Sequence, residues 1–113
     1  SVTDIVTDDW YNYDAKYRKG GSKHVIPANI PKDIFELCLS YAVKAHQSLG
    51  CRGVTRSDFR WNEEKGKEGL YILELNTQPG MTKTSLVPEQ AKYVGLDLPQ
   101  LCLDLIKDAS CNK

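Results

Sequence analysis

Apolar residues recur every three or four positions from residue 34 to residue 49, which is the spacing of one face of an amphipathic helix. Pro31 suits the first helical turn, and Gly50 suits the position just past the last turn. Acidic side chains at positions 33 and 36 would complement the positive end of the helix dipole. We therefore predict a helix of about 18 residues here. Its apolar stripe is Ile34, Leu37, Cys38, Tyr41, Ala42, Ala45 and Leu49.

Two shorter helices are predicted nearer the C-terminus. One begins around Ser85 to Glu89 and ends near Gly95. The other follows Asp97, a residue type that caps helix N-termini, and has Pro99 in its first turn. Its apolar positions also follow helical spacing, so we interpret it as a packing helix. These positions are Leu98, Leu101, Cys102, Leu105, Ile106 and Ala109.

The remaining patterned segments are extended. An aromatic run at residues 10–13, a polar segment at 16–23 that contains two glycines, and a strand-like run at 24–26 predict strand, mobile loop and strand. Two further strand-like runs, 53–61 and 70–76, are separated by the turn-rich NEEKGKEG, which predicts a hairpin. The chain therefore reads as an α+β domain with a mainly antiparallel sheet flanked by helices.

The hairpin would gather four polar side chains on one face. Counting outward from Gly66 places Asp58 opposite Glu74 and Arg56 opposite Asn76. Because side chains alternate along a strand, all four then point to the same side of the sheet. A salt bridge of Arg56 with Asp58 or Glu74 would explain this cluster. Two carboxylates and an amide oxygen are also suitable ligands for Mg²⁺ or Mn²⁺, and spacing alone does not decide between the two.

The segment TQPGMTKTSLVPEQ leads from the second strand into the next predicted helix. Backbone N–H groups at a helix N-terminus can bind a carboxylate or a phosphate. A capped loop that leads into a surface helix explains the same composition, and composition alone favours this simpler interpretation.

Composition excludes several functional classes. The chain has 113 residues, with 15 Lys plus Arg against 15 Asp plus Glu, so it is expected to be one domain without a nucleic-acid-binding surface. No apolar run approaches the roughly 20 residues of a membrane span, and the acidic start SVTDIVTDDW does not lead us to expect export. The four cysteines lack Cys-x-x-Cys pairing, which disfavours a zinc site or a disulfide and favours reduced, cytoplasmic thiols. Because the chain starts at Ser1 and its only methionine is Met81, we interpret it as a processed or truncated piece.

Two blocks, RGVTRSDFR and LELNTQPGMTKTSLVPEQA, resemble the C-terminal third of bacterial D-alanine–D-alanine ligases, members of the ATP-grasp superfamily. The likeness extends upstream to WYNYDAKY and downstream to the terminal helix. It implies that residues 1–113 are the C-terminal part of an ATP-grasp domain. The N-terminal and central lobes, with their phosphate-binding Gly-rich loop, are absent from these residues, so the chain alone is expected to be inactive.

The resemblance implies an enzyme that uses ATP to join two D-alanines through an acyl phosphate, for peptidoglycan synthesis in the cytoplasm. Asp58, Glu74 and Asn76 match the ligands of two Mg²⁺ or Mn²⁺ ions, which decides the open choice in favour of the metal. Arg56 matches the arginine that steadies the tetrahedral oxyanion, and Gly80 matches the glycine whose N–H completes the oxyanion hole.

Further residues are assigned by the same resemblance. Ser85 and Leu86 match the pair that receives the carboxylate of the second D-alanine. Lys16 matches a loop lysine that reaches the nucleotide phosphates, and Tyr17 a loop tyrosine that latches closure and shapes the second-substrate pocket. Trp10, where relatives usually have Phe, and Leu73 match neighbours of the adenine.

Alternative functions are a D-alanine–D-lactate ligase or another ATP-grasp carboxylate–amine ligase, and a non-enzymatic Mg²⁺-binding module. Tyr17 favours the amine nucleophile, because the resemblance places the distinguishing change of the D-lactate enzymes in this loop. The family is commonly dimeric through parts outside this chain, so the sequence leaves the oligomeric state open.

Overall fold

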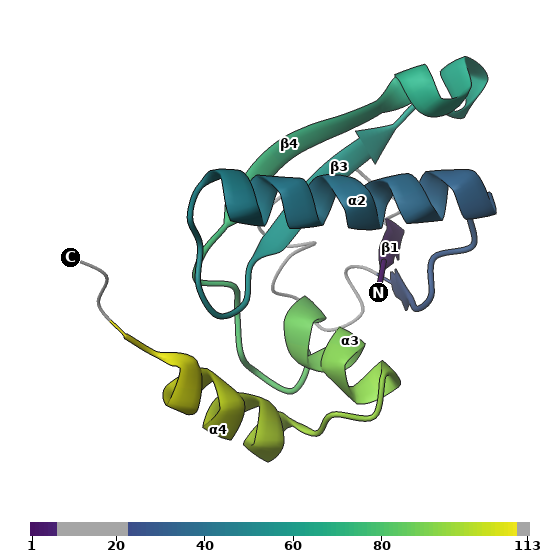
Figure 1. Ribbon diagram of the computed structural model, residues 1–113. Coiled ribbons are helices and arrows are strands. Elements are labelled where there is room, and N and C mark those ends of the chain that lie inside the picture. Colours follow the sequence, from purple (N-terminus) through teal and green to yellow (C-terminus); the bar gives the residue numbers. More distant parts are fainter. Residues whose placement is uncertain (7–22, 111–113) are drawn as a thin grey trace.

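The computed structural model describes residues 1–6 and 23–110 of the chain. Two antiparallel strand pairs, β1–β2 and β3–β4, are combined with three α-helices, and α2 lies over the β3–β4 hairpin (Figure 1). This arrangement confirms the predicted α+β class. The elements are β1 (Asp4–Val6), β2 (Lys23–Val25), α2 (Lys32–Ser48), β3 (Arg56–Trp61), the 3₁₀ segment η1 (Glu63–Gly69), β4 (Leu70–Asn76), α3 (Leu86–Tyr93) and α4 (Leu98–Asp108).

Helix α2 has the bounds that its apolar stripe predicts. It begins directly after Pro31 and ends at Ser48, where the N–H of Gly50 donates to the carbonyl of Gln47 at 3.0 Å. Gly50 has a φ of 63°, a left-handed conformation that a residue with a Cβ adopts at a cost. The predicted stop at Gly50 is therefore confirmed, and its cause is the backbone conformation that the chain needs to leave the helix.

The two C-terminal helices are also confirmed. Asp97 caps α4, and its side chain accepts a hydrogen bond from the N–H of Gln100 at 2.9 Å. Helix α3 is tied to the first strand pair by two neighbouring side chains. Glu89 pairs with Nδ1 of His24 at 2.7 Å, and the Gln90 amide donates to the hydroxyl of Thr3 at 2.9 Å. These contacts join segments that lie more than sixty residues apart in sequence.

The hairpin contains an irregularity that the sequence did not reveal. The register pairs Asp58 with Glu74, but the next pair is Phe59 with Ile72, so Leu73 is an extra residue on β4. Such a β-bulge bends the strand and increases its twist. The connection is also longer than a tight turn, because η1 occupies the whole stretch between the strands and Gly66 takes a φ of 57°.

The core is small and lies between α2 and the hairpin. Ile34, Cys38 and Leu70 are buried, with Phe59 and Trp61 among the partly buried residues that pack around them. Beyond Leu70 the apolar run of β4 is largely exposed, at Tyr71, Ile72 and Leu73. A two-stranded hairpin has two faces, and among the described elements α2 packs on the hairpin without burying the rest of β4.

The described residues also bear on the predictions for the cysteines, the membrane and the N-terminal segment. Cys38, Cys51 and Cys102 carry free thiols. None of the described helices combines the length and apolar character that a membrane span requires. The aromatic run and the polar segment of the predicted N-terminal strand and loop lie outside the described residues, whereas the strand-like run near residue 24 is β2.

Replacing Ile34 with alanine is expected to lower the free energy of unfolding by about 3 kcal/mol, because the side chain is fully packed and its removal leaves a cavity. Ile34 is 2% exposed, whereas Ile106 on α4 is 72% exposed and provides the matched control. Urea unfolding of the 113-residue chain measures both changes. Equal losses for Ile34→Ala and Ile106→Ala would contradict the assignment of the core.

Burial raises the pKa of the Cys38 thiol above its ordinary value. The folded chain therefore keeps a proton at alkaline pH that the unfolded chain releases. The resulting stabilisation is complete below the ordinary thiol pKa of about 8.5 and is lost as the pH rises through the raised value. We expect the stability difference between the wild type and Cys38→Ala to shrink above about pH 9, as measured by urea unfolding at several pH values. A pH-independent difference would contradict this.

Candidate functional site

Four polar side chains lie at the open end of the hairpin, as the register predicts. Arg56 is paired with Asn76, and Asp58 with Glu74. Residues opposed across an antiparallel pair share a face, with Cβ atoms roughly 4.5 to 5.5 Å apart. The regular part of the ladder contains both pairs, because the bulge begins only after Asp58. The predicted gathering of these four groups is confirmed.

Arg56 and Asp58 form a bidentate ion pair. The Nε atom of Arg56 donates to Oδ1 of Asp58 at 2.8 Å, and Nη2 donates to Oδ2 at 3.0 Å. The two side chains are 25% and 31% exposed, so the pair is partly shielded from water. Two parallel bonds fix the plane of the guanidinium as well as its position. The salt bridge considered from the sequence is therefore present, on the same face as the candidate metal ligands.

The opposite strand adds two oxygen donors. Within the described part of the chain, the Glu74 carboxylate has no hydrogen bond or ion pair, and the residue is exposed. The side-chain oxygen of Asn76 accepts the N–H of Gln78 at 3.1 Å, which turns the chain out of β4. With Asp58 and Glu74 negative and Arg56 positive, this cluster carries a net charge of −1.

The donor set fits a hard cation. Each carboxylate oxygen of Asp58 keeps a second lone pair beside its bond to Arg56, and the Asn76 oxygen likewise keeps one. Mg²⁺ prefers oxygen ligands and usually completes its coordination with water and phosphate. No group of three or more His, Cys, Asp or Glu suited to a metal occurs in residues 1–6 and 23–110. Two acids and one amide can thus supply only part of a coordination sphere.

The loop after β4 folds back so that Gly80 lies against Ser85. A Cβ atom at Gly80 would come within 2.8 Å of the Ser85 hydroxyl oxygen, a distance that non-bonded atoms of these types avoid. Thr82 closes the same turn, because its carbonyl accepts the N–H of Ser85 at 3.0 Å and its own N–H donates to the Ser85 hydroxyl oxygen at 3.0 Å. The glycine is therefore required by the close approach of this backbone to Ser85.

Ser85 also begins α3. Its backbone is extended, with a φ of −77° and a ψ of 152°, and its side chain caps none of the N–H groups of the helix. The N–H groups of the first turn have no partner within a helix, and Leu86 is the first helical residue. The start of α3 thus lacks the side-chain cap that the simpler interpretation of this segment assumed.

Of the remaining candidate residues, Leu73 lies in the described part of the chain and three others do not. Leu73 is the bulged residue of β4 and is 61% exposed, directly before Glu74. Trp10, Lys16 and Tyr17 lie outside the described residues. Thr82, which contacts Ser85, was not among the residues predicted for the site. The spacing of hydroxyl residues in the string TKTS could have indicated a turn closed by side chains.

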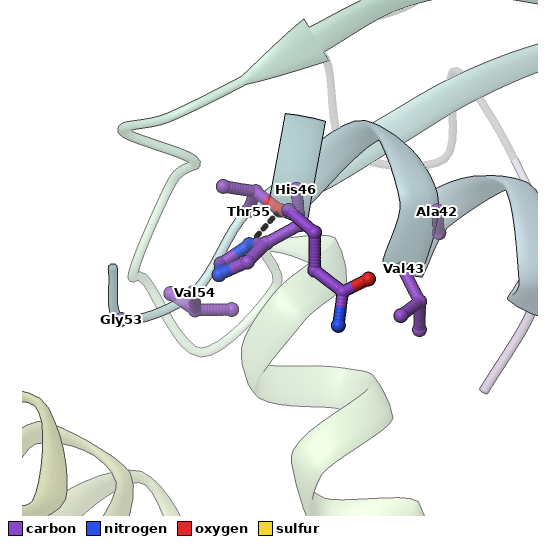
Figure 2. Close-up of a pocket in the computed structure, with 7 residues that line it drawn as sticks. Ala42, Val43, His46, Gly53, Val54 and Thr55 are labelled. Atoms are coloured by element: carbon purple, nitrogen blue, oxygen red, sulfur yellow. Dashed lines mark hydrogen bonds between the residues drawn. The ribbon is translucent and has the colours of Figure 1, made fainter. Parts of the chain in front are cut away.

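Two hollows in the structure lie apart from these groups. One, of about 320 Å³, lies between the end of α2 and residues 53–55, where Nδ1 of His46 and the hydroxyl of Thr55 are 2.9 Å apart (Figure 2). The other, of about 540 Å³, lies between α4 and the loop that contains Thr77, Gln78, Pro79 and Met81. Arg56, Asp58, Glu74 and Ser85 line neither hollow. These four groups of the candidate site therefore lie outside both hollows.

Comparison with known proteins decides the family. A family model described as D-ala D-ala ligase C-terminus matches residues 1–107. The chain belongs to this family. It is 63% identical over 113 residues to the D-alanine–D-alanine ligase of Roseobacter denitrificans, and 61% identical to that of Ruegeria pomeroyi. All of the chain is covered in both comparisons, but only 35% and 37% of those proteins, so the chain spans about a third of their length.

Solved structures agree with the fold. A D-alanine–D-alanine ligase from Bacillus anthracis superposes with a TM-score of 0.73 over 94% of this chain and 34% of that protein, at 24% identity. The same ligase complexed with ATP gives a TM-score of 0.67 over 76% of this chain and 28% of that protein. The family resemblance and the α+β fold are both confirmed.

Proposed function

We propose that residues 1–113 form the C-terminal part of the ATP-grasp domain of a D-alanine–D-alanine ligase. The full-length protein would join two D-alanines with consumption of ATP, for peptidoglycan synthesis. The main support is the hairpin register, which brings Arg56, Asp58, Glu74 and Asn76 to one face of the hairpin. The second strand of this hairpin leads into Gly80 and Ser85. A cytoplasmic location belongs to the same proposal, because the reaction consumes ATP.

The proposed reaction has two steps. A carboxylate oxygen of the first D-alanine attacks the γ-phosphorus of ATP, which gives an acyl phosphate and ADP. The amine of the second D-alanine then attacks the acyl carbon and forms a tetrahedral oxyanion. Collapse of this intermediate expels inorganic phosphate and leaves the peptide bond, while the attacking nitrogen loses a proton. Both steps develop negative charge on oxygen, so preorganised positive groups accelerate them.

Asp58, Glu74 and Asn76 would hold two Mg²⁺ or Mn²⁺ ions, which neutralise the phosphate charge when bound. The two carboxylates supply negative charge, and the neutral amide limits repulsion among the ligands. Exposure of Glu74 and the unused lone pairs of Asp58 support this role. Leu73, exposed at the bulge beside Glu74, is proposed as an apolar neighbour of the adenine.

Arg56 and the N–H of Gly80 are proposed to stabilise the oxyanion. The bidentate contact with Asp58 fixes the guanidinium, so little reorganisation is needed when the negative charge develops. The absence of a side chain at Gly80 allows a substrate to approach its backbone closely. The hydroxyl of Ser85 and the N–H of Leu86 would receive the carboxylate of the second D-alanine at the start of α3.

Three more residues complete the proposal. Lys16 would reach the nucleotide phosphates, Tyr17 would latch the closed site and shape the second-substrate pocket, and Trp10 would lie near the adenine. These roles rest on the sequence resemblance to the family. The chain spans about a third of the length of its relatives, which supports a further part of the proposal, namely that the chain is inactive until the N-terminal and central lobes provide the opposite wall.

The ligation assay tests the proposal with the full-length protein that carries this chain. We expect D-alanyl-D-alanine, ADP and phosphate from D-alanine and Mg-ATP, and no ester product with D-lactate. Glu74→Gln is expected to lower kcat by roughly 100-fold or more, because a neutral amide would hold less firmly the Mg²⁺ that neutralises the charge of the transferred phosphoryl group. Glu68→Gln in η1, an exposed residue away from the candidate face, is the matched control and should leave kcat unchanged. Normal kcat and normal Mg²⁺ dependence in Glu74→Gln would exclude Glu74 from the metal site.

Arg56→Ala in the same protein is expected to lower kcat by roughly 100-fold to 1,000-fold, with little change in the Kd for ATP. Arg56→Lys keeps the charge but lacks the planar fork that Asp58 holds, so it should recover only part of the rate. Rapid-quench measurement of phosphoryl transfer and of peptide formation separates the two steps. If peptide formation from the acyl phosphate proceeds at the wild-type rate in Arg56→Ala, the oxyanion role is wrong.

A further inference from the structure

Thr82 surrounds the hydroxyl oxygen of Ser85 with two hydrogen-bonding groups. Its backbone N–H donates to Oγ of Ser85 at 3.0 Å, and its hydroxyl oxygen lies 2.6 Å from the same atom. The second distance is at the short end of the range for hydrogen bonds between hydroxyl groups. The turn is held in register by the third contact, from the N–H of Ser85 to the carbonyl of Thr82.

A serine hydroxyl has one hydrogen and two lone pairs. The N–H of Thr82 can only donate, so it occupies one lone pair of Ser85 Oγ. The contact between the two hydroxyls allows two arrangements. If Thr82 donates, both lone pairs of Ser85 are occupied and its hydrogen points away from Thr82. If Ser85 donates, its hydrogen is used within the turn, and the lone pair that remains would repel an anion.

The surroundings of Ser85 favour the first arrangement when a carboxylate is bound. Ser85 precedes the first helical residue of α3, where the N–H of Leu86 has no partner within a helix. A carboxylate accepts hydrogen bonds and cannot donate them, so it selects the state in which Ser85 offers its hydrogen. Donation from Thr82 to Ser85 also strengthens donation from Ser85 to the ligand, because hydrogen bonds in a chain polarise one another.

We propose that Thr82 is a positioning residue for the second D-alanine, because its N–H and its hydroxyl fill both acceptor sites of Ser85 and leave the Ser85 proton for the substrate carboxylate. This inference rests on the role proposed above for Ser85. It gives the loop a means of preferring an anionic group, because both contacts of the Ser85 hydroxyl within the described residues come from Thr82.

Steady-state kinetics of the full-length protein provide the test. Thr82→Val keeps the N–H and the branched shape but removes the hydroxyl. We expect it to raise the KM for the second D-alanine about tenfold, since a hydrogen bond to a charged group is weakened. The kcat and the KM for ATP should stay within about twofold of the wild type. Thr82→Ser restores the hydroxyl and should return the KM to within about twofold of the wild-type value.

Two controls separate this role from a merely structural one. Thr84 is an exposed threonine of the same turn whose side chain has no hydrogen bond to any other described residue, so Thr84→Val should leave the kinetics unchanged. If Thr82 acts through Ser85, adding Thr82→Val to Ser85→Ala should produce no further rise in the KM for the second D-alanine. A thermal unfolding scan of every variant reports any general loss of structure.

The outcomes are distinct. The inference is overturned if Ser85→Ala raises the KM for the second D-alanine and Thr82→Val does not. It is also overturned if Thr82→Val has its full effect in the Ser85→Ala background, or if it raises every kinetic constant together with a fall in Tm. If ligation proceeds but Ser85→Ala leaves that KM unchanged, the carboxylate role proposed for Ser85 is wrong and the inference falls with it. Absence of ligation by the wild type would instead refute the proposed function.

Discussion

The pairing register of β3 with β4 determines which polar side chains of the hairpin meet in the candidate site. Side chains alternate across a strand with a period of two, so a slip of one residue would move Glu74 and Asn76 to the opposite face from Asp58 and Arg56. The one shift that the register does contain is the bulge at Leu73, which lies between the candidate face and η1. The bulge therefore divides the hairpin into two parts with different surroundings. The part near η1 packs Leu70 and Trp61 with α2, and the part beyond the bulge presents polar groups.

The two carboxylates of this face differ in their ion partners. Arg56 neutralises Asp58 through two hydrogen bonds, while Glu74 has no ion partner in the described residues. A cation that binds here meets one neutralised and one unneutralised carboxylate, and the amide of Asn76 adds an oxygen without charge. The guanidinium is held beside the ligands by the same bonds. Under the proposed function, one strand pair would therefore carry both the ligands of the cation that counters charge on phosphate and the guanidinium that counters charge on an acyl oxygen.

Local patterns predicted most of the elements, because their causes are local. The stripe of α2, its stop at Gly50 and the cap of α4 by Asp97 depend on helix periodicity and on single backbone positions. The pairs Asp58 with Glu74 and Arg56 with Asn76 followed from counting outward from Gly66. That counting would also pair Phe59 with Leu73, which is wrong, because nothing in the composition of β4 marks the bulge. The count was right for the candidate face because the extra residue Leu73 offsets the error in the assumed centre of the connection that η1 forms.

The exposure of β4 was not predictable from the strand itself. Tyr71 and Ile72 are residues that usually pack in a sheet, yet they are 51% and 45% exposed, since burial depends on what covers the sheet from elsewhere. The hydroxyl contact of Thr82 with Ser85 was missed for a related reason, because the turn must form before the two side chains meet. The chain covers about a third of the length of its relatives, and Leu73 and Glu74 are neighbouring exposed residues of β4, one apolar and one charged. Under the proposed function, the same exposure that leaves the hairpin weakly packed would let it contribute one wall of the nucleotide site, with the bulge between its apolar and its polar contacts.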